Sequence, residues 1–358
     1  MKNLITILAL SVLTACGNGE IKELKSTNSC VGCDLTEADL SGLDLTGADL
    51  TRADLSSSDL TNTNLAGANL SESIIFSAKL TEADFSGANL AGAYLDSILI
   101  GTRFNGANLS GADLTGVLIL DKPEDDKTSF TGANLAGANL KWKSFYDIDF
   151  SGADLSKATL DEAVFVGANL TGANLAEASL FQTDLTEANL TKANLTNTSL
   201  IYTDLTKANL TEANFSGALL SSPTYSPLFP VNHVVKLREA MLIRVNLSGF
   251  YLVDVSLTNA DLTGANLREA NLTGVSFTEA NLSGADLREA NLTGVFFRGA
   301  NLSGADLTGA EHDYIRNGFA KITYDDNFID SNGKNYIKKE SIPTLSCYCI
   351  SGMTGCDC

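Results

Sequence analysis

NLREANLTGVSFTEANLSGADLREANLTGVFFRGANLSGA is the sequence of Asn266–Ala305, which consists of two near-copies of one twenty-residue unit. Inside each copy a five-residue unit repeats: a small residue, Asp or Asn, Leu or Phe, and then two mostly polar residues. The apolar centres are Leu267, Leu272, Phe277, Leu282, Leu287, Leu292, Phe297, Leu302 and Leu307. A fixed period of this kind predicts a repeat architecture, in which each unit packs on the next.

A five-residue period suits neither an α-helix, which repeats every 3.6 residues, nor a flat strand, which repeats every two. It suits a chain that turns by about 90° every five residues, so that four sides close one coil of a solenoid. The central Leu or Phe and the small residue two positions earlier then point inward, and the other three residues face water. Residues twenty apart stack at the strand spacing of about 4.8 Å, so we expect Phe277 over Phe297 and Phe145 over Phe165.

The units in Ala38–Leu55 (ADLSGLDLTGADLTRADL) and Thr186–Leu195 (TEANLTKANL), together with those of Asn266–Ala305, resemble the pentapeptide-repeat family. The resemblance implies an all-β fold, a right-handed quadrilateral β-helix over residues 30–310. The number of repeat centres predicts about twelve coils of about 4.8 Å each. Such a solenoid is one long domain.

The repeat has three interruptions. A one-residue slip falls around Asp96–Gly101, and an insertion with Pro and four acids occupies Asp121–Ser129. The Pro-containing segment Ser221–Met241 is predicted to replace about one coil. After Ala310 the repeat stops, and two short predicted strands, Ile322–Ile329 and Asn335–Lys339, flank an Asn-Gly turn signal. Because the last coil of a solenoid is an open sheet edge, residues 311–358 are predicted to form a Cys-rich cap.

The chain begins with a targeting segment, residues 1–15, whose apolar run is too short to span a bilayer. Leu13-Thr14-Ala15-Cys16 resembles the lipobox of bacterial lipoproteins. That resemblance implies cleavage before Cys16, attachment of diacylglycerol and a fatty acid such as palmitate, and a place in the cell envelope. Gly17 follows Cys16, which favours the outer membrane over the inner one. Residues 16–29 are predicted to be a polar tether.

Six cysteines remain after Cys16: Cys30, Cys33, Cys347, Cys349, Cys356 and Cys358. In an oxidising compartment an even number predicts disulfides. We expect Cys30 and Cys33 to staple the first coil, either locally or across coils, and the other four to pair within the tail. A metal site is the alternative, although the tail lacks the usual Cys-x₂-Cys spacing of zinc ligands.

The charge of the chain and the spacing of its polar residues argue against catalysis and against binding of nucleic acid. The formal charge of −19 comes with no basic run, and binding phosphates needs Lys and Arg. The only histidines, His233 and His312, suggest no catalytic spacing, and the carboxylates are evenly displayed instead of gathered in a desolvated pocket. We therefore expect no enzyme activity and no cofactor.

Two sets of outward residues are candidate contacts. The first is a series of acids at six successive outward positions, an acidic surface or a weak Ca²⁺ site: Asp34, Asp39, Asp44, Asp49, Asp54 and Asp59. Stacked like charges destabilise a sheet, whereas the Asn residues of later coils can form a ladder. The second set is Trp142 and Tyr146, beside Lys141 and Lys143. Lys143 occupies an inward position, and both lysines are expected to meet the acids of the insertion at residues 124–126.

The sequence thus predicts a lipid-anchored, extracytoplasmic, non-catalytic structural or interaction protein with an unknown protein partner. Two other functions stay open. Some family members imitate B-DNA and bind DNA gyrase, which the acidity fits and the leader does not. The second open function is metal binding or redox chemistry by the terminal cysteines.

Overall fold

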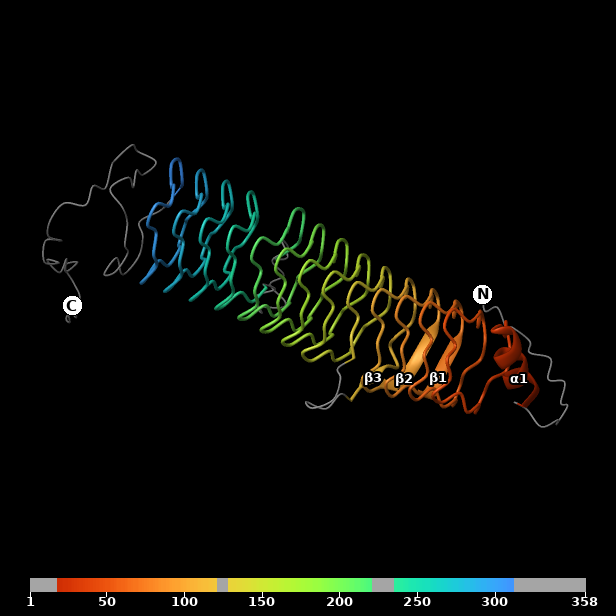
Figure 1. The fold of residues 1–358 in the computed structure, drawn as a ribbon. Helices are drawn as coiled ribbons and strands as arrows, with labels where there is room; N and C mark the ends of the chain where they lie inside the picture. Colours follow the sequence, from red (N-terminus) through yellow and green to blue (C-terminus); the bar gives the residue numbers. More distant parts are fainter. Residues whose placement is uncertain (1–17, 121–127, 221–234, 312–358) are drawn as a thin grey trace, which may run out of the picture.

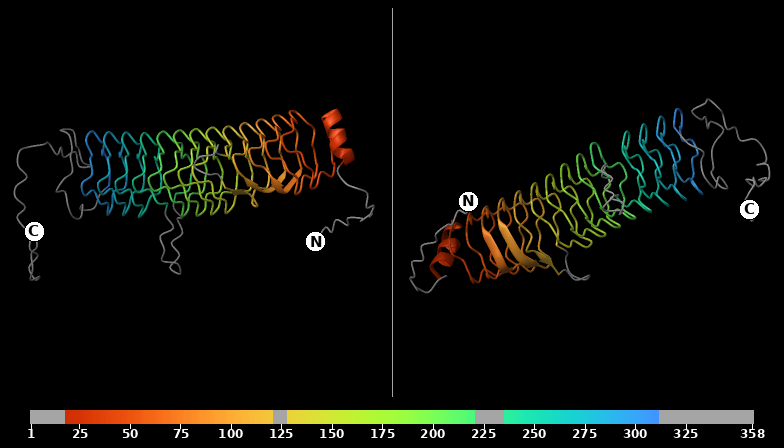
Figure 2. Two further views of the ribbon diagram at one scale, coloured as in Figure 1. Left: turned by 60° about the horizontal axis from the view of Figure 1, so that its bottom comes forward. Right: turned by 180° about the vertical axis from the view of Figure 1, so that it is seen from behind.

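The computed structural model describes residues 18–120, 128–220 and 235–311, which form a long rod of stacked four-sided coils (Figure 1). Its regular elements are helix α1 (Asn18–Thr27) and strands β1 (Ile74–Lys79), β2 (Tyr94–Leu99) and β3 (Leu118–Ile119). The three strands form one parallel sheet in the order β1-β2-β3. Most other sides of the coils consist of a single bridge residue followed by a two-residue turn (Figure 2).

The outward Asp or Asn of each repeat carries the backbone ladder between coils. The N–H of Asn69, for example, donates to the carbonyl of Ala48 (2.8 Å), and its own carbonyl accepts from the N–H of Leu50 (2.7 Å). A bond from the N–H of Ala53 to the carbonyl of Leu50 (3.0 Å) closes the intervening turn. The polar backbone of a coil is therefore satisfied by its neighbours, which lets the chain wind around an apolar interior.

Most turns place their second residue in the left-handed region. Gly47 adopts this conformation (φ 65°), as Gly allows without a steric penalty, but Glu37 also adopts it (φ 57°). Left-handed non-glycine residues are uncommon, and their recurrence here means that the stacked coil imposes the turn. The structure thus fixes the turn geometry even where the sequence does not favour it.

Leu, Phe and Ala side chains fill the inside of the coils. Four buried rings stack in one column, with centroid distances of 5.1 Å (Phe85–Phe104), 5.0 Å (Phe104–Phe130) and 4.9 Å (Phe130–Phe150). The two pairs expected from the twenty-residue spacing also meet. Phe277 stacks on Phe297 at 5.4 Å, and Phe145 lies 4.9 Å from Phe165.

The interruptions change the spacing of paired residues without breaking the stack. At the slip, Asp84 pairs with Arg103, 19 residues later. At the first insertion, Asn108 pairs with Asn134, 26 residues later. The coil resumes before the predicted end of that insertion, because Thr128 is buried and Ser129 pairs with both Arg103 and Asp149.

The prediction that 221–241 replaces a coil is wrong. Lys236 pairs with Asp204, 32 residues earlier, and Leu237 and Ala240 are buried core residues. The repeat has already resumed at Val235, so the extra residues lie within a coil and do not replace one. Val235-Lys236-Leu237 fits the repeat once Val stands for the small residue and Lys for the Asp or Asn.

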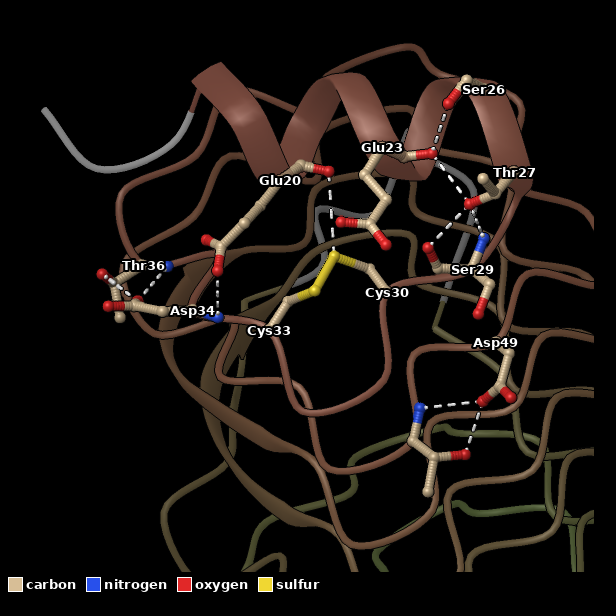
Figure 3. Close-up of a disulfide and its surroundings, with 11 residues drawn as sticks. Glu20, Glu23, Ser26, Thr27, Ser29, Cys30, Cys33, Asp34, Thr36 and Asp49 are labelled. Atoms are coloured by element: carbon tan, nitrogen blue, oxygen red, sulfur yellow. Dashed lines mark hydrogen bonds between the residues drawn. A yellow bond between two sulfur atoms is a disulfide. The ribbon is translucent and has the colours of Figure 1, made fainter.

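Residues 18–27 are not a tether but helix α1, which lies across the first coil (Figure 3). Ile21 and Leu24 are three residues apart, the spacing that puts two side chains on one helix face, and Leu24 is fully buried in the core. Glu20 accepts a hydrogen bond from the N–H of Asp34 (3.4 Å). The helix covers apolar surface that the first coil would otherwise expose, which is the physical reason for its position.

Candidate interaction surface

The aspartates of the first coils cap their own turns. Oδ1 of Asp39 accepts the hydroxyl of Ser41 (2.6 Å) and the N–H of Ser41 (3.1 Å). Asp44 makes the same pair of bonds with Thr46. This local bonding satisfies the turn backbone and gives Asp a structural role at these positions.

The capping bonds hold the pKa values of these carboxyl groups down. The Ser41 hydroxyl, and then its N–H, lower the pKa of Asp39 below its usual range, outweighing the stacked Asp59, which acts in the opposite direction. The Lys79 ammonium (2.9 Å), followed by the Thr61 hydroxyl, lowers the pKa of Asp59 to about 2. The like-charge stack is therefore relieved by hydrogen bonds and by one ion pair.

The six aspartates do not form one surface. Bridges pair Asp34 with Asp54 and Asp39 with Asp59, while the ladders of Asp44 and Asp49 run separately to Asn64 and Asn69. Successive acids thus occupy successive sides of the coil, around the whole circumference of the rod. A partner approaching from one direction would meet at most two of them on one ladder.

One side of the rod carries a ladder of amides, which we call the asparagine ladder. Nδ2 of Asn108 donates to Oδ1 of Asn89 (2.9 Å), and Oδ1 of Asn108 accepts from Asn134 (3.1 Å). Its members from the second coil onward include Asn69, Asn89, Asn108, Asn134, Asp154, Asn174 and Asn194, and the ladder continues through Asn214, Asn246 and Asn266. Like the capping aspartates, these side chains are hydrogen-bonded to their neighbours.

The outer surface of β1, β2 and β3 is different. Large apolar or aromatic side chains stand there at outward positions, with Leu118 50% and Ile98 47% exposed. We call this surface the strand face; its residues are Ile74, Phe76, Tyr94, Ile98, Leu118 and Leu120. Along β2 the backbone continues as a strand with no left-handed residue at the corner (Figure 1). Strand β1 keeps a left-handed residue at Ser77, and its register with β2 shifts between Phe76 and Lys79. The apolar runs Ile74-Ile75-Phe76 and Ile98-Leu99-Ile100 carried a signal for it in the sequence.

Trp142 and Tyr146 extend the strand face by one coil. They are 62% and 60% exposed, and the pairing of Asp113 with Asn139 and the bond from Lys143 to Val117 place their coil next to that of β3. The Lys141 ammonium lies 4.4 Å from the Trp142 ring centroid and 3.9 Å from Glu162.

Lys143 does not fill the corner that its position in the repeat would give it. It is half-buried, and its Nζ donates to the carbonyl of Val117 (3.3 Å) in the coil below. The acids at 124–126 that both lysines were expected to meet lie outside the described residues.

Cys30 and Cys33 form a local disulfide at the base of the first coil (Figure 3). Cys16, the four tail cysteines, both histidines and the two predicted tail strands lie outside the described residues. Within residues 18–120, 128–220 and 235–311, no cluster of three or more potential metal ligands occurs. In the same part of the chain, no helix has the length and apolar character that crossing a membrane requires.

Comparison with known proteins points to one family. The sequence matches the family described as Pentapeptide repeats over residues 33–71, 77–117, 148–186, 188–222, 240–279 and 280–311. No curated protein gives a significant match.

Solved structures to which the chain is similar include the following three. A trypsin-treated form of QnrB1, a plasmid-mediated fluoroquinolone resistance protein, is 21% identical over 50% of this chain and 91% of its own, with a TM-score of 0.39. HetL, from the cyanobacterium Nostoc and involved in heterocyst differentiation regulation, is 28% identical over 83% of this chain and 97% of its own, with a TM-score of 0.26. A protein of the Arabidopsis thaliana thylakoid lumen is 23% identical over 42% and 69%, with a TM-score of 0.16.

Proposed function

The chain belongs to the pentapeptide-repeat family, and on that premise we propose that it is a non-catalytic interaction scaffold, lipid-anchored through Cys16 at the bacterial envelope. Family members adopt a right-handed quadrilateral β-helix, a solid rod suited to displaying surfaces. The proposal assigns the rod to the extracytoplasmic side, with the outer membrane as its site.

A non-catalytic role is supported by how the polar groups are used. The carboxylates of Asp39 and Asp44 hold their own turns, and the amide of Asn108 is bonded to its neighbours in the ladder. Apolar side chains pack the described interior. Acid–base catalysis needs a titratable group whose pKa is moved towards the working pH, whereas the capping bonds move these carboxyl groups the other way.

The strand face is the single observation that carries the interaction role. Large exposed apolar side chains occupy positions where most of the coil carries Asn, Asp, Ser or Thr. They are not needed by the coil, which closes equally well over polar outward residues. Contiguous apolar surface of this size marks an interaction site.

Two experiments test the proposal. In cells, the protein should incorporate labelled fatty acid and sediment with membranes, and Cys16→Ala should abolish both. A photo-crosslinking residue at position 98 should yield a specific product in intact cells, whereas one at position 296, an exposed apolar position far along the rod, should not. A Cys16→Ala protein that stays anchored would contradict the lipid attachment, and no product from position 98 would contradict the interaction role.

The gyrase alternative keeps a physical argument of its own. B-DNA carries about 3 charges per 4.8 Å of axis, and a net charge of −19 spread over about twelve coils is roughly half of that. Wild-type protein found in the cytoplasm, together with inhibition of supercoiling by purified gyrase, would favour it. Stoichiometric metal bound by the tail cysteines would favour the metal alternative.

A further inference from the structure

Helix α1 leaves almost no free chain between Cys16 and the folded rod. It begins at Asn18, two residues after Cys16, and two residues of fully extended chain span at most about 7 Å. A lipid carried by Cys16 is therefore held close to the first turn of α1. The stretch that was expected to act as a tether is folded, so it adds no slack between the anchor and the rod.

Helix α1 is fixed to the first coil along its length. Near its start, a carboxylate oxygen of Glu20 accepts the N–H of Asp34 (3.4 Å; Figure 3). In its second half, Leu24 is fully buried in the core. Just after its end, Nδ2 of Asn28 donates to the carbonyl of Thr46 (3.0 Å). The helix and the first coil therefore move together, and an anchor next to the helix holds the rod itself.

The outward side of α1 is exposed at the end of the rod (Figure 1). Its exposed side chains include Lys22, Glu23, Lys25 and Ser26. The helix carries two Lys and two Glu, so it has no net charge. Such a surface meets a layer of phospholipid headgroups without net electrostatic repulsion.

The sides of the first coils are acidic instead. Residues 34–60 carry seven acids and one Arg. The ladders that begin at Asp34, Asp39, Asp44 and Asp49 run along the four sides of the rod. A Ser or Thr hydroxyl is the main cause that lowers the pKa of each of these carboxyl groups, so all four are charged at neutral pH. Laying any side of the rod on a bilayer would press carboxylates against its anionic lipids.

The strand face does not remove this cost for a rod that lies flat. Ile98 belongs to the ladder that begins with Asp39 and Asp59, so carboxylates would reach the bilayer together with the apolar side chains. Asp96 accepts the hydroxyl of Tyr94 (3.0 Å) near the middle of the face itself. The charges thus favour contact through the end of the rod over contact through a side.

We propose that the outward side of α1 rests on the phospholipid headgroups of the bilayer that holds the Cys16 lipid, kept there by the short link, with the rod standing away from the membrane. This orientation rests on the proposed function, through the lipid at Cys16, and adds the surface that meets the membrane. Three ladder steps of about 4.8 Å separate Asp39 from Ile98, so Ile98 stands roughly 14 Å above the first coil. A partner that binds the strand face must therefore reach close to the membrane.

Contact quenching in vesicles tests the orientation. Lipidated full-length protein with one genetically encoded fluorescent residue is reconstituted into vesicles of phosphatidylethanolamine and phosphatidylglycerol that contain a lipid with a nitroxide on its headgroup. A probe at position 26 in α1 should lose most of its fluorescence, relative to vesicles without nitroxide. Probes on the four sides of a coil near the far end should keep theirs; these are at positions 283, 288, 293 and 298.

A longer link between the lipid and the helix tests the cause of the contact. Twenty Gly and Ser residues inserted between Gly17 and Asn18 have an average span of about 25 Å. The insertion should lower the quenching at position 26 severalfold, while fatty-acid incorporation stays unchanged. It lies ahead of the helix, so the circular dichroism spectrum and the melting temperature should stay those of the wild type. Quenching that the insertion leaves unchanged would overturn the short link as the cause.

Failure of this orientation differs from failure of the proposed function. If the protein incorporates labelled fatty acid but position 26 is quenched no more than position 298, the lipid anchor stands and the contact through α1 is wrong. Quenching at any of the four far positions would show a rod that lies flat and would overturn the standing arrangement. If the protein incorporates no fatty acid, both fail.

Discussion

The asparagine ladder and the strand face belong to the same coils. On the ladder the outward position of the repeat holds a hydrogen-bonded amide, and on the strand face it holds an exposed apolar side chain. On the ladder, Asn89 and Asn108 bond to each other, so the side chains add to the stability of the stack. On the strand face, Ile74 and Ile98 point away from the core and do nothing for it. Because the interior is packed by Leu, Phe and Ala in both cases, the outward residue is free to serve either stability or contact.

The difference teaches where to look for function in a repeat protein. Positions that obey the repeat are explained by the fold. Positions that depart from it and gain exposed apolar surface, such as Phe76 and Leu118, have no explanation in the fold.

The largest effect is expected in the shared core. Phe130 is fully buried between Phe104 and Phe150, so Phe130→Asp would bury an unpaired charge at a cost of several kcal/mol. We expect loss of the β circular dichroism spectrum. Phe296→Asp, at an exposed position, is the control and should stay folded. A cooperative melt of Phe130→Asp near that of the wild type would contradict the packed column.

A smaller effect is expected on the asparagine ladder. Asn108→Ala removes a bond to Asn89 and one from Asn134, and should lower the free energy of unfolding by about 1–2 kcal/mol. On the strand face, Ile98→Asn should change it by about 0.5 kcal/mol, because the side chain is close to half exposed and lies outside the buried core. Denaturant titration in dilute solution measures both. If the two variants lost the same free energy of unfolding, the two surfaces would not differ in their contribution to stability.

The smallest effect concerns pH. The folded-state pKa of Asp59 is about 2, below its value in an unfolded chain, so its contribution is present above about pH 4 and is lost as the pH falls towards 2. The melting temperature should therefore decline from pH 4 to pH 2. Asp59→Asn, which keeps the ladder position but cannot titrate, should make the decline shallower. An unchanged slope would show that Asp59 and Lys79 contribute nothing in solution.

Period and residue size were enough to predict the four-sided coil and the Phe277–Phe297 stack, because every repeat gives the same information. Helix α1 was missed because a short polar segment gains its structure only from the coil edge that it covers. The resumption at Val235 was missed because Val and Lys replace the usual residues of the unit.

The candidate site was predictable only in part. Trp142 and Tyr146 were identified as candidate contacts, but the strand face below them was not, because the stretch around Asp96–Gly101 was interpreted only as a one-residue slip of the repeat. The hydrogen bonds by which the aspartates cap their turns could not be predicted, because a five-residue spacing does not say where the side-chain oxygens point.

The tolerance of the ladder to extra residues has a practical meaning. Partners separated by 26 or 32 residues, such as Asn108 with Asn134 and Asp204 with Lys236, pair like those separated by twenty, so the ladder between coils continues across extra residues. Height along the axis is then a nearly linear function of position in the gene, about 4.8 Å for every twenty residues of repeat. A tag inserted at a chosen turn would therefore be displayed at a known height along the rod axis.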